Sequence, residues 1–406
     1  MRSSPEAGRP EGALAGYRVL DLTGPLGVYC AKLLADLGAD VVRVEPPGGD
    51  PMRRQPPYYR APDGSERSLY YLHMNTSKRA ISLDLARPRG RDLLLRLVER
   101  ADVLVESYAP SYLPSLGLGY PVLRERNPRL VLTSITSFGQ NGPYAEYQAS
   151  DLVGQAMGGV LALTGYADGT PLRLACDQGY HSASVHACAG TLIALYHREA
   201  TGEGQRVDAS MQEALALTMQ PATQYWDLKQ QRQGHHNLRF GSTTPCKDGH
   251  VAVAMGRAQA VERVATWLAE AGLFEGLESA RWDDPAWLAA ARPRVQQGLR
   301  TLLMRHTKAE LIEEAQRRGI WLSPVYTAED VAADPQLAAR GFFQPVEYPE
   351  LGVTLTHPGG PFVMSESPWR MAHRAPLPGE DNTAIYGGEL GLSEREIEAL
   401  QREGII

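Results

Sequence analysis

The chain has 406 residues, of which 43% are apolar and 22% charged, and its formal net charge is -6. This composition is typical of a globular protein with a sizeable core, and the acidic balance gives no reason to expect nucleic acid as a partner. No run comes near the ~18 consecutive apolar residues that indicate a membrane span. The N-terminus lacks the apolar core of a signal peptide, and the four dispersed cysteines form no CxxC pair. We therefore expect a cytoplasmic protein with reduced thiols and no membrane partner.

The first part of the chain alternates short β-rich segments with helical ones. "YRVLDLT" (17–23) predicts a strand, and "VYCAKLLADLGAD" (28–40) predicts a helix that Gly38 would end. The pattern continues with "VVRVEPP" (41–47), "KRAISLDL" (78–85), "PRGRDLLLRLVERA" (88–101), "DVLVES" (102–107), "PVLRERNP" (121–128) and "RLVLTSITSFG" (129–139). Parallel strands need such helical crossovers, so we predict an open doubly wound parallel sheet in the first two hundred residues.

The middle of the chain has a different character. "GSTTPCKDGHVAVAMG" (241–256) predicts a hairpin that turns at 247–249, and helical patterns follow at 258–272, 285–304 and 308–318. Helix-and-strand material then returns and ends in a short polar helix at 393–406. We therefore predict three segments: a large α/β domain from 14–224, a small α+β domain at 225–325, and a return to the large domain at 326–406.

One stretch, "CDQGYHSASVHACAG" (176–190), gathers residues that carry chemistry. His181 and His186 are five apart, which separates them by about 140° on a helix, so they are poor partners for one metal ion. Asp177 and His181 share a face, but two ligands do not make a metal site. Cys176 and Cys188 are interpreted as buried structural thiols rather than nucleophiles. These residues alone favour the start of a helix, with Asp177 or His181 near its cap.

Several strings in a fixed order carry a resemblance to a known family. They are "GYRVLDLT", "CAKLLADLGADVVRVEPPGGDPMR", "NTSKRAISLDL", "ADVLVESYAP", "NPRLVLTSITSFGQNGP", "DLVGQAMGGVLALTG", "LIALYHREATGEGQRVDASM" and "YTAEDVAADPQLAARGFF". Together they closely resemble the class III CoA-transferase family, the CaiB–BaiF type, from about residue 14 to the C-terminus. The resemblance implies a large α/β domain built from both chain ends, a small inserted domain, and an interlocked homodimer or heterodimer with a homologous subunit.

The resemblance also implies a reaction: CoA moves between an acyl-CoA thioester and a carboxylic acid, without a permanently bound cofactor or metal. In the family an aspartate attacks the thioester, since a carboxylate is a nucleophile whose adduct stays activated. Counting back from "LIALYHREATGEGQ" puts Tyr180 at that position, with Asp177 three residues earlier. The racemase branch of the family needs a histidine where this chain has Ser150, which argues against racemase activity. Asp177, Tyr180 and His181 are the candidate catalytic residues.

The resemblance further implies where coenzyme A binds. The expected contacts are Pro25, Leu26, Gly27, Leu83, Asp84, Leu85, Ala86, Ser107, Tyr108, Ala109, Thr136, Ser137, Phe138 and Gly139. Pro46 and Ser115 stand where the family often has arginine or another polar residue, so fewer cations would face the CoA phosphates. The cations that would compensate are Arg43, Arg53, Arg54, Lys78 and Arg79.

Three hypotheses follow from the missing aspartate. The first is a CoA-transferase with altered chemistry, which uses Asp177 or lets the acceptor carboxylate attack the thioester directly. The second is a non-catalytic subunit paired with a homologue that carries the aspartate. The third is an acyl-CoA-binding or lyase-like protein.

Overall fold

The computed structural model describes residues 12–165, 170–230 and 242–406. Residues 12–165, 170–230 and 341–406 form one compact unit, and residues 242–340 form a second. The second unit is therefore inserted in the chain of the first. The domain ranges 14–224, 225–325 and 326–406 stay predictions of where the folding units divide. None of the helices in the described ranges is both long and apolar enough to cross a bilayer.

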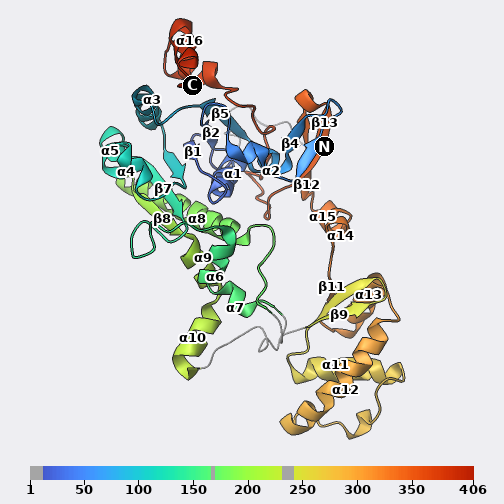
Figure 1. The fold of residues 1–406 in the computed structure, drawn as a ribbon. Coiled ribbons are helices and arrows are strands. Elements are labelled where there is room, and N and C mark those ends of the chain that lie inside the picture. The colour runs from blue at the N-terminus through green and yellow to red at the C-terminus, as the bar shows by residue number, and fades with distance from the viewer. Residues whose placement is uncertain (1–11, 166–169, 231–241) are drawn as a thin grey trace. The chain divides into compact units, whose positions relative to one another are not determined.

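A six-stranded sheet forms the centre of the first unit (Figure 1). Its strands are β1 (Arg18–Leu22), β2 (Asp40–Glu45), β5 (Lys78–Ser82), β6 (Val103–Glu106), β7 (Val131–Thr136) and β8 (Arg206–Ser210). They lie in the order β5-β2-β1-β6-β7-β8, and every neighbouring pair is parallel. The predicted parallel sheet is confirmed. The order of the strands reverses between β1 and β6, which is where ligands bind in open sheets of this kind.

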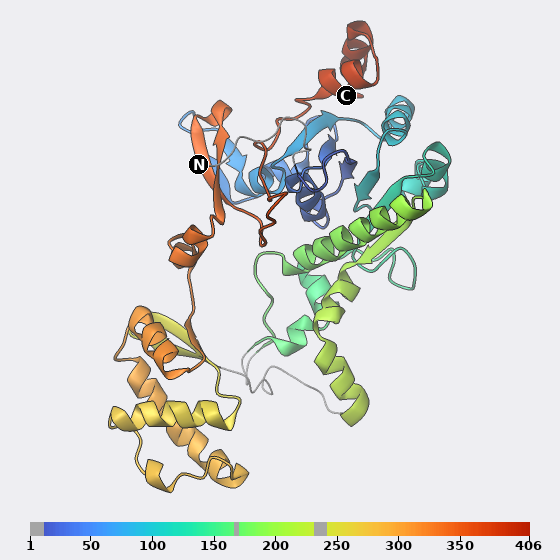
Figure 2. The ribbon, with the colours of Figure 1, turned by 180° about the vertical axis from the view of Figure 1, so that it is seen from behind.

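Helices cover both faces of this sheet, which explains its nearly continuous apolar strands. Val19, Val41 and Val103 pack on one side with α1 and α8, whereas Leu20 and Leu104 pack on the other with α3 and α5. These helices are α1 (Val28–Asp36), α3 (Pro88–Val98), α5 (Tyr120–Arg126) and α8 (Gln178–Thr201). Figure 2 shows the long helix α8 running beside β7 and β8.

Shorter elements complete the part of the first unit that precedes the insertion. They are η1 (Pro51–Arg54), β3 (Tyr58–Arg60), β4 (Glu66–Ser68), α2 (Leu69–Met74), α4 (Tyr112–Ser115), α6 (Asp151–Met157), α7 (Val160–Leu163), α9 (Met211–Thr218) and α10 (Gln220–Lys229). The predicted stop of α1 is confirmed, since Gly38 has a φ of 102° and its N–H is donated to Ala35 O.

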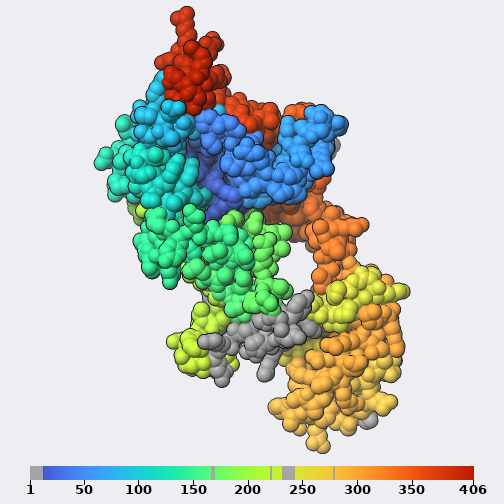
Figure 3. Space-filling model, viewed as in Figure 1, coloured from blue at the N-terminus to red at the C-terminus, as the bar shows by residue number. Residues whose placement is uncertain are grey.

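The C-terminal part of the chain returns to the first unit, and its red and orange atoms lie against the blue N-terminal part in Figure 3. Its elements are β12 (Phe343–Tyr348), η4 (Pro349–Leu351), β13 (Val353–Pro358), η5 (Thr383–Glu389) and α16 (Glu394–Arg402). The exposed side of edge strand β5 is paired by side chains: Ala80 N donates to Asp381 Oδ2 at 2.8 Å, and Ser82 N donates to Asn382 Oδ1 at 3.0 Å. This pairing removes a strand edge that would otherwise be open to association.

The second unit has a small antiparallel sheet with helices packed against it. The sheet has the order β11-β10-β9, and β9 and β10 pair Cys246 with Gly249, so the predicted hairpin is confirmed. The elements of this unit are β9 (Ser242–Cys246), β10 (Gly249–Val253), α11 (Ala258–Glu270), η3 (Leu277–Ser279), α12 (Pro285–Leu303), α13 (Lys308–Arg318), β11 (Leu322–Pro324), α14 (Ala328–Ala332) and α15 (Pro335–Ala339).

Two histidines, the half-buried His73 and the buried His357, join α2 to the β12–β13 hairpin. His73 Nδ1 and His357 Nδ1 lie 3.3 Å apart, and their rings stack with centroids separated by 5.6 Å. His357 Nε2 also lies 3.1 Å from the Tyr348 hydroxyl. Burial, with the nearby charge of Lys32, lowers the pKa of His73 to about 3 and that of His357 to about 4. Both rings are therefore neutral in the folded protein at pH 7.

This pair predicts a loss of stability in mild acid. Both folded pKa values lie below the ordinary value of 6.5, so the unfolded chain takes up protons first as the pH falls. The free energy of unfolding should therefore decrease from about pH 6.5 towards pH 4, as measured by urea denaturation. The double variant His73→Asn/His357→Gln should flatten this decrease, whereas His186→Gln, at an exposed position, should not. An unchanged slope in the double variant would contradict the account.

Candidate functional site

Two adjoining cavities lie at the carboxyl ends of the central strands. The first, called the Tyr180 cavity, has a volume of about 370 Å³, and its lining includes Pro25, Leu26, Ser107, Tyr108, Ala109, Thr136, Ser137 and Tyr180. The second, called the Asp84 cavity, has a volume of about 340 Å³, and its lining includes Pro25, Arg43, Glu45, Pro46, Asp50, Leu83, Asp84, Leu85 and Tyr108. Gly24, Pro25 and Tyr108 line both. The cavities therefore meet at the β1–β6 switch point, where the crevice of an open α/β sheet binds ligands.

Most of the residues expected to contact coenzyme A line one of these cavities. The residues that do so are Pro25, Leu26, Leu83, Asp84, Leu85, Ser107, Tyr108, Ala109, Thr136 and Ser137. Those that line neither cavity are Gly27, Ala86, Phe138 and Gly139. The Thr136 hydroxyl is buried and has no hydrogen-bond partner in the described chain, so a ligand in the Tyr180 cavity would satisfy it.

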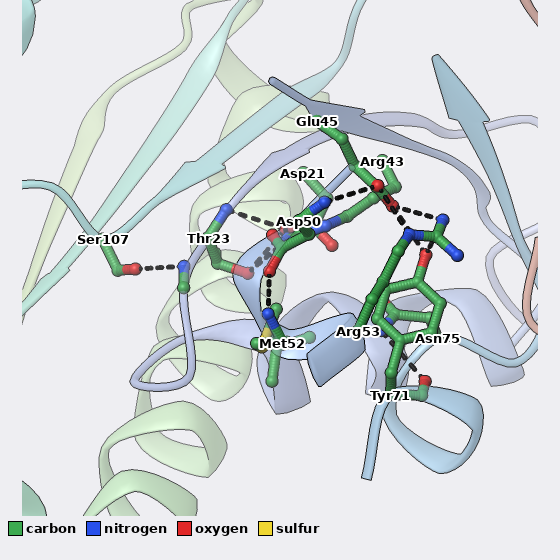
Figure 4. Close-up of polar contacts among 12 residues, drawn as sticks. Asp21, Thr23, Arg43, Glu45, Asp50, Met52, Arg53, Tyr71, Asn75 and Ser107 are labelled. Atoms are coloured by element: carbon green, nitrogen blue, oxygen red, sulfur yellow. Dashed lines mark hydrogen bonds and ion pairs between the residues drawn. The ribbon is translucent and has the colours of Figure 1, made fainter. Parts of the chain in front are cut away.

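A network of buried charges lies beneath this edge of the sheet (Figure 4). Asp21 Oδ1 accepts from Arg43 Nη1 and Asp21 Oδ2 accepts from Lys78 Nζ, each at 2.9 Å. Arg43 also pairs with Asp50. Burial opposes the charge of Asp21, but Arg43 and Lys78 outweigh it and hold the pKa of this carboxyl below its usual value. Burial lowers the pKa of Lys78 to about 8 despite Asp21. Arg43 and Lys78 are therefore already neutralised by carboxylates.

Most of the other cations that were expected to bind phosphate also form ion pairs with carboxylates of the protein. Arg53 donates to both oxygens of Glu45, at 2.7 and 2.8 Å (Figure 4). Arg79 Nη2 donates to Asp40 Oδ2 at 2.6 Å. Arg54 is exposed. Arg54 lines neither cavity, so the expectation that these cations compensate for Pro46 and Ser115 stays a prediction.

A carboxylate from another helix caps the N-terminus of α8. Asp177 is the N-cap residue, but its side chain makes no capping bond. Instead Asp151 Oδ1 accepts from Gly179 N at 2.7 Å and from Tyr180 N at 3.3 Å, and Asp151 Oδ2 accepts from Gln155 Nε2 at 2.6 Å. A Cβ on Gly179 would lie 2.8 Å from Asp151 Oδ1, so only glycine permits this close approach. Asp151 is missing from the residues selected by sequence, although it follows Ser150 at the start of α6.

The three candidate catalytic residues come from the first turn of α8 and its cap. Tyr180 lines its cavity and is half-buried; burial, with the charges of Asp151 and Asp177, raises the pKa of its phenol. It is therefore protonated at neutral pH and suits hydrogen-bond donation rather than nucleophilic attack. His181 meets the edge of Tyr29, with ring centroids 4.9 Å apart, and burial lowers its pKa below 6.5.

Asp177 is the carboxylate next to this site. No hydrogen bond to its carboxylate oxygens is found within residues 12–165, 170–230 and 242–406. Its charge helps to raise the pKa of Tyr180 and, after burial, that of Tyr70, so all three groups lie within electrostatic range. Asp177 and Cys176 have φ values of 50° and 59°, a left-handed conformation that non-glycine residues seldom adopt outside functional sites and turns.

Two expectations about sulfur and metal chemistry concern the same stretch. Cys188 is buried, as expected of a structural thiol, but the same interpretation of Cys176 is wrong, because this residue is exposed at the loop before α8. His181 is half-buried and His186 is exposed. In the described part of the chain, no three His, Cys, Asp or Glu residues gather in a way that would hold a metal ion.

Removing the Asp151 cap should destabilise the site. Asp151→Ala leaves the amides of Gly179 and Tyr180 and the Gln155 side chain without their acceptor, which should cost about 1–3 kcal/mol of unfolding free energy. The matched control is Asp177→Asn, which keeps a residue that tolerates left-handed backbone and removes no capping bond. Urea denaturation of both variants checks this prediction. Equal stability of the two variants would contradict the assigned role of Asp151.

Comparison with known proteins identifies the family of this chain. A family model described as CoA-transferase family III matches residues 14–382. The chain is 39% identical over 402 residues to succinyl-CoA:(R)-benzylsuccinate CoA-transferase subunit BbsE of Thauera aromatica, covering 96% of this chain and 97% of that protein. It is 34% identical over 421 residues to a formyl-CoA:oxalate CoA-transferase of Streptomyces avermitilis, covering 97% and 99%. A CAIB/BAIF family protein from Brucella suis has a similar solved structure, with a TM-score of 0.82, 28% identity and coverage of 93% and 99%. The chain belongs to CoA-transferase family III.

Proposed function

We propose that this protein moves CoA between an acyl-CoA thioester and a carboxylic acid, with the thioester held along the Asp84 and Tyr180 cavities. One observation carries the proposal: two adjoining cavities at the switch point lead to Tyr180, which stands where the family resemblance expects the nucleophile. The names of the similar transferases, which pair succinyl-CoA with benzylsuccinate and formyl-CoA with oxalate, support the same class of substrates.

The carboxylate of Asp177 is the candidate nucleophile. An Asp177 oxygen would attack the thioester carbonyl carbon and expel CoA thiolate, which leaves a mixed anhydride. The thiolate would then attack the aspartyl carbonyl, release the donor acid and form an aspartyl-CoA thioester. The acceptor carboxylate would attack this thioester and expel CoA thiolate to give a second mixed anhydride, and the thiolate would attack the acceptor carbonyl, which forms the product acyl-CoA and frees Asp177. The protonated phenol of Tyr180 would donate a hydrogen bond to the thioester oxygen during each attack.

Trapping of the covalent intermediate tests this chemistry. After incubation with a panel of acyl-CoAs, hydroxylamine or borohydride should leave a modification on Asp177 that mass spectrometry detects. Asp177→Asn should abolish both the modification and transfer, because an amide is a poor nucleophile, whereas Tyr180→Phe should slow transfer about 10²-fold by removing one hydrogen-bond donor. Transfer by the chain alone without any adduct would show instead that the acceptor carboxylate attacks the thioester directly.

A second function, that of a non-catalytic subunit, is favoured by one specific observation. The residue that lines the cavity at the family's nucleophile position is a phenol, and the similar protein BbsE is named as one subunit of its transferase. In this case the chain alone should show neither adduct nor transfer. Transfer should appear only when a homologous chain that carries the aspartate is added. A third, lyase-like function has no comparable observation in its favour.

We also propose that two chains of this family associate as the interlocked dimer that the resemblance implies. Helices α8 and α10 expose large apolar side chains, with Ile193 at 68%, Tyr196 at 82% and Leu228 at 82% of their surface accessible. Ile193 and Tyr196 are three residues apart and so share one face of α8. Exposed apolar side chains gathered in this way are typical of an interface with another chain.

The association should depend on this apolar surface. Ile193→Lys/Tyr196→Lys should convert a dimer to a monomer in light scattering after gel filtration, because charged groups would be buried without partners. The control Gln401→Lys adds one charge at an exposed position of α16 and should leave the mass unchanged. A dimer that persists in the double variant at micromolar concentration would contradict the assignment of this face.

A further inference from the structure

The positions of the two cavities indicate where each end of a bound CoA thioester would lie. The thioester must lie near Tyr180 if the chain handles CoA as proposed above, so this inference depends on the proposed function. The pantetheine arm then occupies the Tyr180 cavity. The Asp84 cavity, which adjoins it through Gly24, Pro25 and Tyr108, receives the nucleotide end with its 3′-phosphate.

The charged residues that line the Asp84 cavity are unfavourable for a phosphate. They comprise one cation, Arg43, and three carboxylates, Glu45, Asp50 and Asp84. Arg43 is 1% exposed, and its two terminal nitrogens are held by Asp21 and Asp50 (Figure 4). Its Nε–H is buried and has no hydrogen-bond partner among the residues that the structure describes. The guanidinium is therefore already paired with the carboxylates around it and cannot form a bidentate pair with a phosphate.

The carboxylates are held in place by the protein, so they do not move away from a ligand. Glu45 accepts from Arg53 and from the Tyr71 hydroxyl at 2.6 Å (Figure 4). Asp84 Oδ1 accepts from Ala86 N at 2.8 Å, and its other oxygen lies 3.6 Å from the exposed guanidinium of Arg87. Pro46 contributes no charge to the lining. Arg53, Arg43 and Arg87 offset the charges of these carboxylates, so a phosphate with about 1.5 to 2 negative charges near pH 7 would meet no lining cation that is free to pair with it.

We propose that this chain does not select for the 3′-phosphate of coenzyme A, and that it recognises CoA thioesters by their adenosine and pantetheine parts. Removal of the 3′-phosphate should therefore leave binding unchanged or make it tighter. Pro46 is the specificity-determining position, because it lines the cavity and is exposed, so a cation placed there would reach the phosphate.

Titration calorimetry of the full chain with CoA and with dephospho-CoA, at 0.15 M salt, tests the proposal. We expect dephospho-CoA to bind with a Kd equal to or lower than that of CoA. Pro46→Arg should lower the Kd for CoA about tenfold and leave the Kd for dephospho-CoA unchanged. The matched control Pro47→Arg adds the same charge to the next residue, which does not line the cavity, and should change neither Kd.

Each contrary result has a distinct meaning. If dephospho-CoA binds tenfold more weakly than CoA to the unmodified chain, the proposal is overturned while CoA binding and the proposed function stand. An equal gain for both ligands in Pro46→Arg also overturns it, because the added cation would then act elsewhere than on the 3′-phosphate. If neither ligand binds, the proposed function fails and this inference fails with it.

Discussion

Asp21 accepts hydrogen bonds from two buried cations, Arg43 and Lys78, and the carboxyl edge of the sheet depends on this interaction. Each of these charges would be costly to bury alone, and removal of one partner leaves an uncompensated charge that costs about 3–5 kcal/mol. Arg43 carries the network onward to Asp50, at the start of η1, and Lys78 connects β5 to α1 by donating to Val28 O. The network thereby holds together the loops that line the Asp84 cavity. Its two cations pair with the carboxylates of Asp21 and Asp50, so they are not free to bind a ligand.

The order of the strands explains why the cavities lie where they do. The loops after β1 and β6 diverge at the switch point, which leaves a crevice lined by Gly24, Pro25 and Tyr108. Helix α8 brings Tyr180 to one end of this crevice because Asp151 fixes its first turn. The site is therefore a property of the parallel sheet and of one tertiary cap, and its chemistry is decided by few side chains at that cap.

The sequence predicted the strands, the helices and the helix ends, because these depend on the local pattern of residues. Strands such as "DVLVES" are apolar on both faces because helices cover both, and Gly38 ends α1 because it adopts a positive φ. Contacts between distant residues leave no such pattern. Asp151 caps a helix 28 residues later in the chain, and Asp381 covers the edge of β5 from 301 residues away, so neither role was predicted. The exposure of Cys176 was missed for the same reason, since it depends on how the loop before α8 is held.

A crystal structure of the protein with bound acyl-CoA would test the central claim most directly, namely that the two cavities form one CoA-thioester site. The account predicts continuous density from the Asp84 cavity past Tyr108 to Tyr180, with the nucleotide at the first end and the thioester at the second. Density elsewhere on the protein, with both cavities filled only by solvent, would contradict it.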